Sequence, residues 1–167
     1  MSDLSRSFPM NRLLQGDVGS GKTIVATMAA LQAIKNGGQV GFMAPTKILA
    51  EQHFIKLKEW LNPLHISVAF LSGSISLAEK KIIYAKLIKG DIDLLVGTHA
   101  LIQDKVKFKS LALYIIDEQH RFGVEQRLQI RSNNITSTHV EAHQLMMSAT
   151  PIPRTLSMSY FADMDIS

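Results

Sequence analysis

Apolar positions along the chain fall into two alternating patterns, short continuous runs and longer segments with helical spacing. The short runs predict strands buried on both faces, because they lack a clean alternation with polar residues. The longer segments repeat apolar residues at helical spacing and stop at asparagine, glycine or proline, which predicts helices. The predicted strands cover residues 12–15, 40–44, 67–71, 93–96, 111–116 and 144–148, and the predicted helices cover residues 23–35, 48–61 and 77–88.

The alternation of strands and helices predicts an α/β fold with a mostly parallel sheet and helices on both faces. In such a sheet, ligands gather at the carboxyl ends of the strands, so the residues that follow each strand matter most. Small, polar or charged residues follow every predicted strand, which predicts one functional edge. We expect four methionines to fill the core, namely Met28, Met43, Met146 and Met147.

The segment after the first predicted strand reads Gly-Asp-Val-Gly-Ser-Gly-Lys-Thr, which is the phosphate-binding pattern G-x-x-x-x-G-K-[ST]. Lys22 is expected to reach the β- and γ-phosphates, and the Thr23 hydroxyl to ligate Mg²⁺. The glycine positions do not fit the dinucleotide pattern G-x-G-x-x-G, so the sequence predicts a nucleoside triphosphate site. Its candidate phosphate-binding residues are Gly16, Asp17, Val18, Gly19, Ser20, Gly21, Lys22 and Thr23.

Two acidic residues, Asp117 and Glu118, follow the apolar run 111–116, where an unpaired buried charge would be unfavourable. A metal ion beside a triphosphate would offset that charge. We therefore expect Asp117 to be the Walker B aspartate that holds Mg²⁺ together with Thr23. Glu118 is expected to orient and polarise the attacking water. The alternative is a strand that ends in solvent with two capping acids, and the complete phosphate loop favours the catalytic interpretation.

Composition and the positions of the histidines limit which other kinds of site the chain could contain. The chain has 167 residues, enough for one domain, and its net charge of +4 permits a polyanionic partner without requiring one. It contains no cysteine and no apolar run that could span a membrane, and a reducing cytoplasm is the default compartment. The segment His139-Val140-Glu141-Ala142-His143 does not form the H-E-x-x-H metal motif. We expect His53 on a helix surface and His65 in a loop.

Six motifs in a fixed order make the chain resemble the first motor domain of the superfamily 2 helicases, and within them the RecG family of bacterial branch-migrating DNA helicases. They are LLQGDVGSGKT at 13–23, MAPT at 43–46, ILAEQH at 48–53, GTHALIQ at 97–103, DEQHRFGV at 117–124 and SATPIPRT at 148–155. The translocase that couples transcription to repair shares much of this order but usually has Asp-Glu-Glu-His, so Gln119 favours the RecG family. Lys47 departs from the acidic residue expected in that family, which is a surface difference.

The resemblance implies a RecA-like P-loop NTPase fold that hydrolyses ATP with Mg²⁺ and acts on branched or forked DNA in recombination and repair. It implies that Gln119 contacts the nucleotide, and that a coupling group responds to the nucleotide state. The coupling residues are His120, Ser148, Ala149 and Thr150. The residues implied to follow the phosphate backbone of DNA are Pro45, Thr46, Gly73, Ser74, Thr98 and His99. Without the family, residues 148–150 would predict only a turn.

The family also implies partner domains. A helicase of this class needs a second motor domain that supplies an arginine finger, and the RecG family adds a fork-binding domain. We therefore expect residues 1–167 to be one motor domain of a larger monomeric helicase, nearly inactive as an ATPase in isolation, with residues 1–10 as a flexible leader. Two other classes stay open. They are a small phosphoryl transferase, which Glu118 beside Asp117 disfavours, and a passive nucleotide- or nucleic-acid-binding module.

Overall fold

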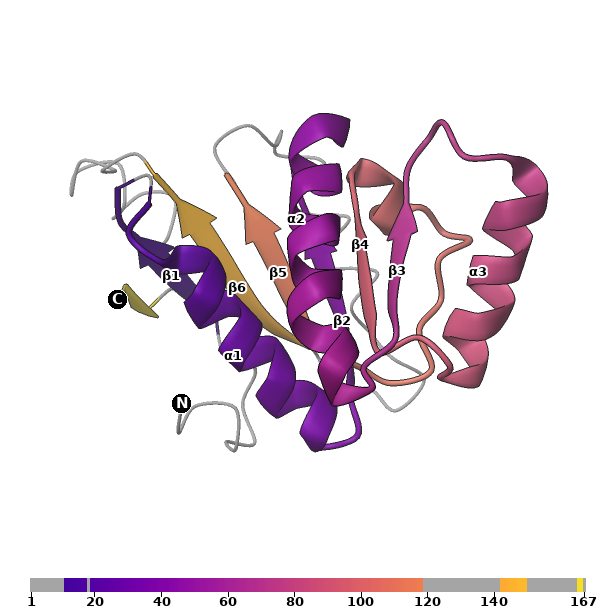
Figure 1. Cartoon of the computed structure of the whole chain (residues 1–167), viewed down its shortest axis with the longest axis horizontal. Helices are drawn as coiled ribbons and strands as arrows, with labels where there is room; N and C mark the ends of the chain where they lie inside the picture. The colour runs from indigo at the N-terminus through magenta and orange to yellow at the C-terminus, as the bar shows by residue number, and fades with distance from the viewer. Residues whose placement is uncertain (1–10, 18, 119–141, 150–164, 167) are drawn as a thin grey trace.

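The computed structural model describes residues 11–17, 19–118, 142–149 and 165–166. These residues form a sheet of seven strands in the order β3-β4-β2-β5-β6-β1-β7, with every neighbouring pair parallel (Figure 1). The predicted parallel α/β fold is confirmed. The strands are β1 (Asn11–Gln15), β2 (Gln39–Met43), β3 (Val68–Leu71), β4 (Leu94–Gly97), β5 (Leu111–Asp117), β6 (His143–Ser148) and β7 (Asp165–Ile166). The helices are α1 (Lys22–Lys35), α2 (Lys47–Leu61) and α3 (Leu77–Lys89), and two 3₁₀ helices are η2 (Asn62–Leu64) and η3 (His99–Ile102).

Each face of the sheet has its own apolar core, because successive side chains of a strand point to opposite faces. Phe42 and Ile115 belong to the core under α1 and α2, which lie across one face of the sheet in Figure 1. Their neighbours Met43 and Ile116 belong to the other core, with residues of α3 and η3. Strands covered on both sides need apolar residues at nearly every position, which explains the continuous apolar runs of the sequence.

Local hydrogen bonds fix where the helices begin and end. The hydroxyl of Thr46 caps α2 by accepting a hydrogen bond from the backbone N–H of Leu49, at 3.3 Å. Ser76 and Glu79 form a complete capping box at the start of α3. Gly90 ends that helix in the left-handed conformation, with φ 87°. Within the part of the chain that the structure describes, no helix has both the length and the apolar character needed to cross a membrane.

The most deeply buried apolar residues of helix α1 are alanines rather than its larger side chains. Its buried residues include Ala26, Ala30 and Ala33, whereas Ile24 is 55% exposed and Met28 is 48% exposed. The prediction that Met28 fills the core is therefore wrong, while Met43, Met146 and Met147 are buried as predicted. The alanines also recur at helical spacing, and their small side chains let a helix backbone lie close to a sheet. The alanines are fully buried in the core, and Leu31 and Ile34 pack against it from partly buried positions.

The remaining differences are short elements that carry weak sequence signals. The two-residue strand β7 pairs with β1, and η3 folds the residues directly after β4 into a 3₁₀ helix. The predicted leader, residues 1–10, lies outside the described residues. The six predicted strands and three predicted helices all occur within one or two residues of their expected positions.

Gly97 occupies the most crowded glycine position at the functional edge. It ends β4 between β2 and β3, opposite Met43 and Leu71. A Cβ atom at this position would lie 2.0 Å from the carbonyl oxygen of Leu71 and 2.4 Å from Cδ1 of Leu101. The carbonyl belongs to the backbone of a paired strand, so it cannot move without disturbing the sheet. The glycine of the Gly-Thr-His segment is therefore required for packing.

We predict that Gly97→Ala lowers the free energy of unfolding by about 3 kcal/mol, because the added methyl overpacks the junction of three strands. Urea denaturation followed by circular dichroism measures the change. Gly73→Ala is the matched control, since no atom lies within 4 Å of its added Cβ. That control should change stability by about 1 kcal/mol or less. Equal midpoints for the two variants would contradict the packing role.

Candidate nucleotide and metal site at the sheet edge

The loop between β1 and α1 adopts a conformation that only glycine accommodates well. Gly19 and Gly21 have φ angles of 85° and 82°, in the left-handed region. The backbone N–H of Ser20 donates to the carbonyl of Asp17 at 3.1 Å, which closes a tight turn. The amides of the first turn of α1 then follow Gly21 directly. A loop that turns tightly into a helix N-terminus points N–H groups at one spot, which suits a bound phosphate.

Lys22 carries the positive charge of this loop. Its Nζ donates to the carbonyl oxygens of Gly16 and Asp17, the second at 2.7 Å, and lies 3.5 Å from Oγ of Ser20. The ammonium group is thus held over the loop by the partly buried carbonyl of Gly16 and by two exposed acceptors that water or a ligand can replace. Thr23 is half-buried at the next position, on the first turn of α1. Val18 lies outside the described residues.

The two predicted acids stand at the carboxyl end of β5, where the structure gives each a distinct environment. Asp117 is buried, with 9% of its surface exposed. Glu118 follows with φ 52°, a left-handed backbone that is uncommon for a residue with a long side chain. Such strain costs of the order of 1–3 kcal/mol and concentrates at functional sites. The local backbone therefore supports a functional role for Glu118 independently of its charge.

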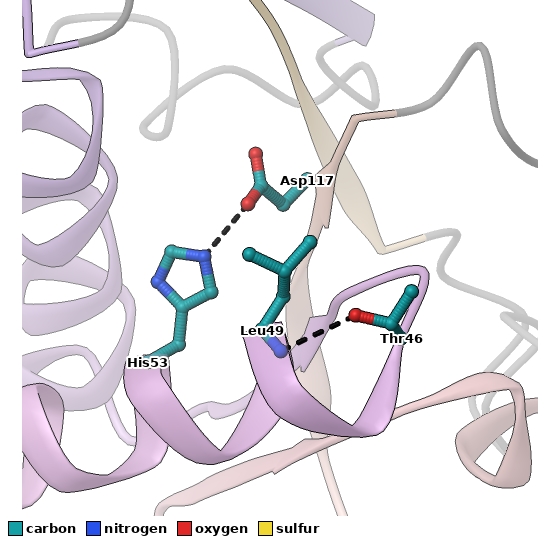
Figure 2. Close-up of polar contacts among 4 residues, drawn as sticks. All are labelled: Thr46, Leu49, His53 and Asp117. Atoms are coloured by element: carbon teal, nitrogen blue, oxygen red, sulfur yellow. Dashed lines mark hydrogen bonds and ion pairs between the residues drawn. The ribbon is translucent and has the colours of Figure 1, made fainter.

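His53 contacts Asp117 directly, and the prediction that His53 lies on a helix surface is wrong. Its Nε2 donates to Oδ2 of Asp117 at 2.7 Å, and its side chain is 14% exposed (Figure 2). The imidazole also packs against Phe42, with ring centroids 4.7 Å apart. A sequence signal for this burial existed, because His53 lies three residues after buried Ala50 and four before buried Leu57.

Strand β6 joins the phosphate loop to the acids. It pairs with β1, where Ser148 lies opposite Gln15, and with β5, where Met147 lies opposite Asp117. The backbone N–H of Gly16 donates to the carbonyl of Ser148 at 3.2 Å. The start of the predicted coupling element therefore touches the start of the phosphate loop. Ala149 follows at the strand exit, and three further predicted residues lie outside the described part, namely Gln119, His120 and Thr150.

The residues predicted to bind DNA follow β2, β3 and β4, which form the other half of the same sheet edge. Thr46, Gly73, Ser74 and His99 are exposed, Pro45 is half-buried and Thr98 is buried. The sheet order places β3-β4-β2 on one side and β5-β6-β1 on the other, so the predicted DNA residues and the predicted nucleotide residues occupy adjacent halves.

The donor atoms at the nucleotide half suit a hard cation. Mg²⁺ prefers oxygen ligands and commonly takes one or two carboxylates together with substrate phosphates and water. Asp117 and Thr23 offer a carboxylate and a hydroxyl of that kind. Among the described residues, no group of three or more His, Asp or Glu side chains could hold a metal by itself. His143 lies at the start of β6, hence at the opposite edge, and burial lowers its pKa below the usual value.

Comparison with known proteins places this arrangement in a helicase family. The family model described as DEAD/DEAH box helicase matches residues 6–159. The chain therefore belongs to the DEAD/DEAH box helicase family. Within that family, its sequence is similar over almost its whole length to ATP-dependent DNA helicases named RecG, which confirms the resemblance predicted from the motifs.

The similarity to RecG is close but covers only part of each relative. The chain is 54% identical to RecG of Pasteurella multocida over 99% of the chain and 24% of that protein. It is 55% identical to RecG of Aquifex aeolicus over 100% of the chain and 21% of that protein. It is 50% identical to RecG of Escherichia coli K12 over 99% of the chain and 24% of that protein. The chain thus spans about a quarter of the length of these relatives.

Solved structures agree with the sequence comparison. A structure of RecG bound to a three-way DNA junction matches with a TM-score of 0.84 and 45% identity, covering 99% of this chain and 21% of that one. A structure of Saccharomyces cerevisiae Dbp5 matches with a TM-score of 0.71 at 17% identity, covering 98% of this chain and 43% of that one. At that identity the yeast protein supports the fold alone.

Proposed function

We propose that the chain is the first motor domain of an ATP-dependent DNA helicase of the RecG type, which acts on branched or forked DNA. The observation that carries this proposal is the meeting of the phosphate loop and the acids Asp117 and Glu118 at one sheet edge, bridged by β6. The relatives named ATP-dependent DNA helicase RecG, and the RecG solved on a three-way junction, support the reaction and the DNA partner.

We propose a separate role for each residue at the half of the sheet edge that holds the phosphate loop and the acids. The loop amides and Lys22 bind the β- and γ-phosphates of ATP, and a phosphate can replace the exposed contact of Lys22 with the carbonyl of Asp17. Thr23 and Asp117 would hold Mg²⁺, which when bound neutralises charge that develops on the phosphates. Glu118 orients the attacking water and accepts its proton. Gln119 contacts the nucleotide, and His120 with Ser148, Ala149 and Thr150 relays the nucleotide state.

The DNA half of the edge is proposed to contact a phosphate backbone without reading bases. Exposed hydroxyls, glycine amides and helix starts suit phosphate contact, and Thr46 stands at the start of α2. Lys80 adds positive charge nearby, since its Nζ donates to the carbonyl of Gly73 at 2.8 Å. Binding through phosphate predicts an affinity that falls steeply with added salt. Thr98 is buried, so His99 offers the more accessible side chain of that pair.

The organisation of the whole protein is part of the proposal. We infer a monomeric, cytoplasmic helicase in which a second motor domain supplies an arginine finger and a further domain grips the fork. The share of each RecG relative that the chain covers, 24% in Pasteurella multocida, supports a single domain of a longer protein. An arginine finger contributes about 10³–10⁵ in rate, so the 167-residue chain alone should hydrolyse ATP very slowly.

The test of the proposed function is ATP hydrolysis by the full-length protein, with and without DNA. We expect forked DNA to stimulate turnover more than linear duplex of equal length, because the fork engages an additional domain. The chain alone, at matched concentration, is the comparison for the missing domains. Stimulation equal on forked and linear DNA would contradict a RecG-type substrate. Absence of any DNA effect would support a passive module or another phosphoryl transferase.

We predict that Lys22→Ala in the full-length protein removes ATP turnover while the domain stays folded. The hydrogen bonds of Lys22 go to the loop itself, namely to the carbonyls of Gly16 and Asp17 and the hydroxyl of Ser20, and not to either apolar core, so its loss should change the unfolding midpoint little. A fluorescent nucleotide measures binding, and a coupled assay measures turnover at saturating DNA. Lys35→Ala, at the exposed last turn of the same helix, is the control and should behave as wild type. Wild-type turnover in the Lys22 variant would refute the assignment.

We predict that Glu118→Gln separates nucleotide binding from hydrolysis. Glutamine keeps the size of the side chain and the metal-binding residues, but it cannot accept a proton from water. Turnover should fall by roughly 10² or more while nucleotide affinity stays near the wild-type value. Glu59→Gln, an exposed carboxylate on α2, controls for a simple loss of charge. If affinity falls together with turnover, Glu118 is a metal or structural residue instead.

A further inference from the structure

A side-chain contact of His53 links helix α2 to the end of β5. Its Nε2 lies 2.7 Å from Oδ2 of Asp117, and the two side chains are 14% and 12% exposed. An ionised carboxylate only accepts hydrogen bonds, so Nε2 carries the hydrogen and donates it. Figure 2 shows the imidazole reaching toward Asp117, with the second carboxylate oxygen directed away from the ring. His53 thus holds Oδ2 of Asp117, and the other carboxylate oxygen points away from the imidazole.

The imidazole is itself held on two sides. Its ring packs against Phe42 of β2 at a centroid distance of 4.7 Å and an interplanar angle of 45°. Its backbone belongs to the buried stripe of α2, between Ala50 and Leu57, which are both 0% exposed. A donor that is fixed by a ring contact and by helix packing restricts the rotation of the carboxylate that it bonds. The pair is therefore a rigid unit, and burial strengthens its hydrogen bond.

We propose that His53 is a positioning residue that fixes the orientation of the Asp117 carboxylate for metal binding. Asp117 is a metal ligand within the proposed function, and this inference rests on that role. A buried carboxylate with one fixed oxygen presents the other in a single direction, so a cation meets a preformed ligand. Partners that orient a metal ligand in this way typically change metal affinity or activity by 10–100-fold when they are removed.

The test replaces His53 in the full-length protein with residues that separate packing from hydrogen bonding. His53→Phe keeps an aromatic ring against Phe42 and removes the donor. His53→Gln restores an N–H donor near the position of Nε2 on an unbranched side chain. His65→Asn is the control histidine, because His65 is exposed and asparagine tolerates its left-handed φ of 59°.

Direct metal binding is the main readout. Electron paramagnetic resonance of Mn²⁺, titrated with a non-hydrolysable ATP analogue present, gives the metal affinity without turnover. We expect His53→Phe to weaken Mn²⁺ binding by about 10-fold or more, and His53→Gln to recover most of the loss. Nucleotide affinity in EDTA should stay close to wild type in both variants. His53→Phe should lower the melting temperature, because the buried carboxylate of Asp117 loses a donor, and His53→Gln should restore most of it. Adding His53→Phe to Asp117→Asn should produce little further change, because both act through one ligand.

Three outcomes decide between positioning and packing. Wild-type Mn²⁺ affinity in His53→Phe would overturn the proposal. A loss that appears only with a lower melting temperature, and that His53→Gln does not reverse, would overturn it in favour of a packing role. A wild-type protein that neither binds Mn²⁺ with nucleotide nor hydrolyses ATP would reject the proposed function itself, and that result is distinguishable because it precedes any comparison of variants.

Discussion

The parallel pairing of β6 with both β1 and β5 is the constraint on which the site depends. Parallel strands bring their carboxyl ends to one edge, and this pairing sets the phosphate loop and the acids on either side of one strand. The hydrogen bond from Gly16 to the carbonyl of Ser148 continues the pairing into the loop itself. Any shift in the register of β6 would therefore move Lys22 relative to Asp117, because both are placed by the same ladder.

The sheet also explains how one edge can carry so many polar groups. Apolar residues on both faces hold the strands in place, and the polar residues of the site stand where each strand leaves the two cores. Gly97 permits the close approach of β3 to β4, and His53 satisfies the buried carboxylate of Asp117. The left-handed backbone of Glu118 is the one strained position among the acids, and the rigid strand before it can sustain that strain.

Sequence patterns predicted most of the fold because buried parallel strands and glycine-ended helices leave strong local signals. They also predicted the phosphate loop and the acids, since those residues are local in sequence. They failed where tertiary packing chose between alternatives: in α1 the alanines, not Met28, face the core. His53 was missed because a histidine on a helix resembles a surface residue until its partner is known. That partner, Asp117, lies 64 residues further along the chain.

Helix α2 contributes residues to both the proposed DNA site and the proposed nucleotide site. Its first turn is capped by Thr46, which is proposed to contact DNA, and about two turns later His53 bonds Asp117 (Figure 2). Buried Ala50, Leu57 and Leu61 pack α2 against the rest of the domain, so its first turn and His53 in its middle belong to one packed helix. A displacement of the first turn of α2 by DNA would therefore also displace His53 and the Asp117 carboxylate that it bonds. The physical route between the two proposed sites is one helix and one hydrogen bond.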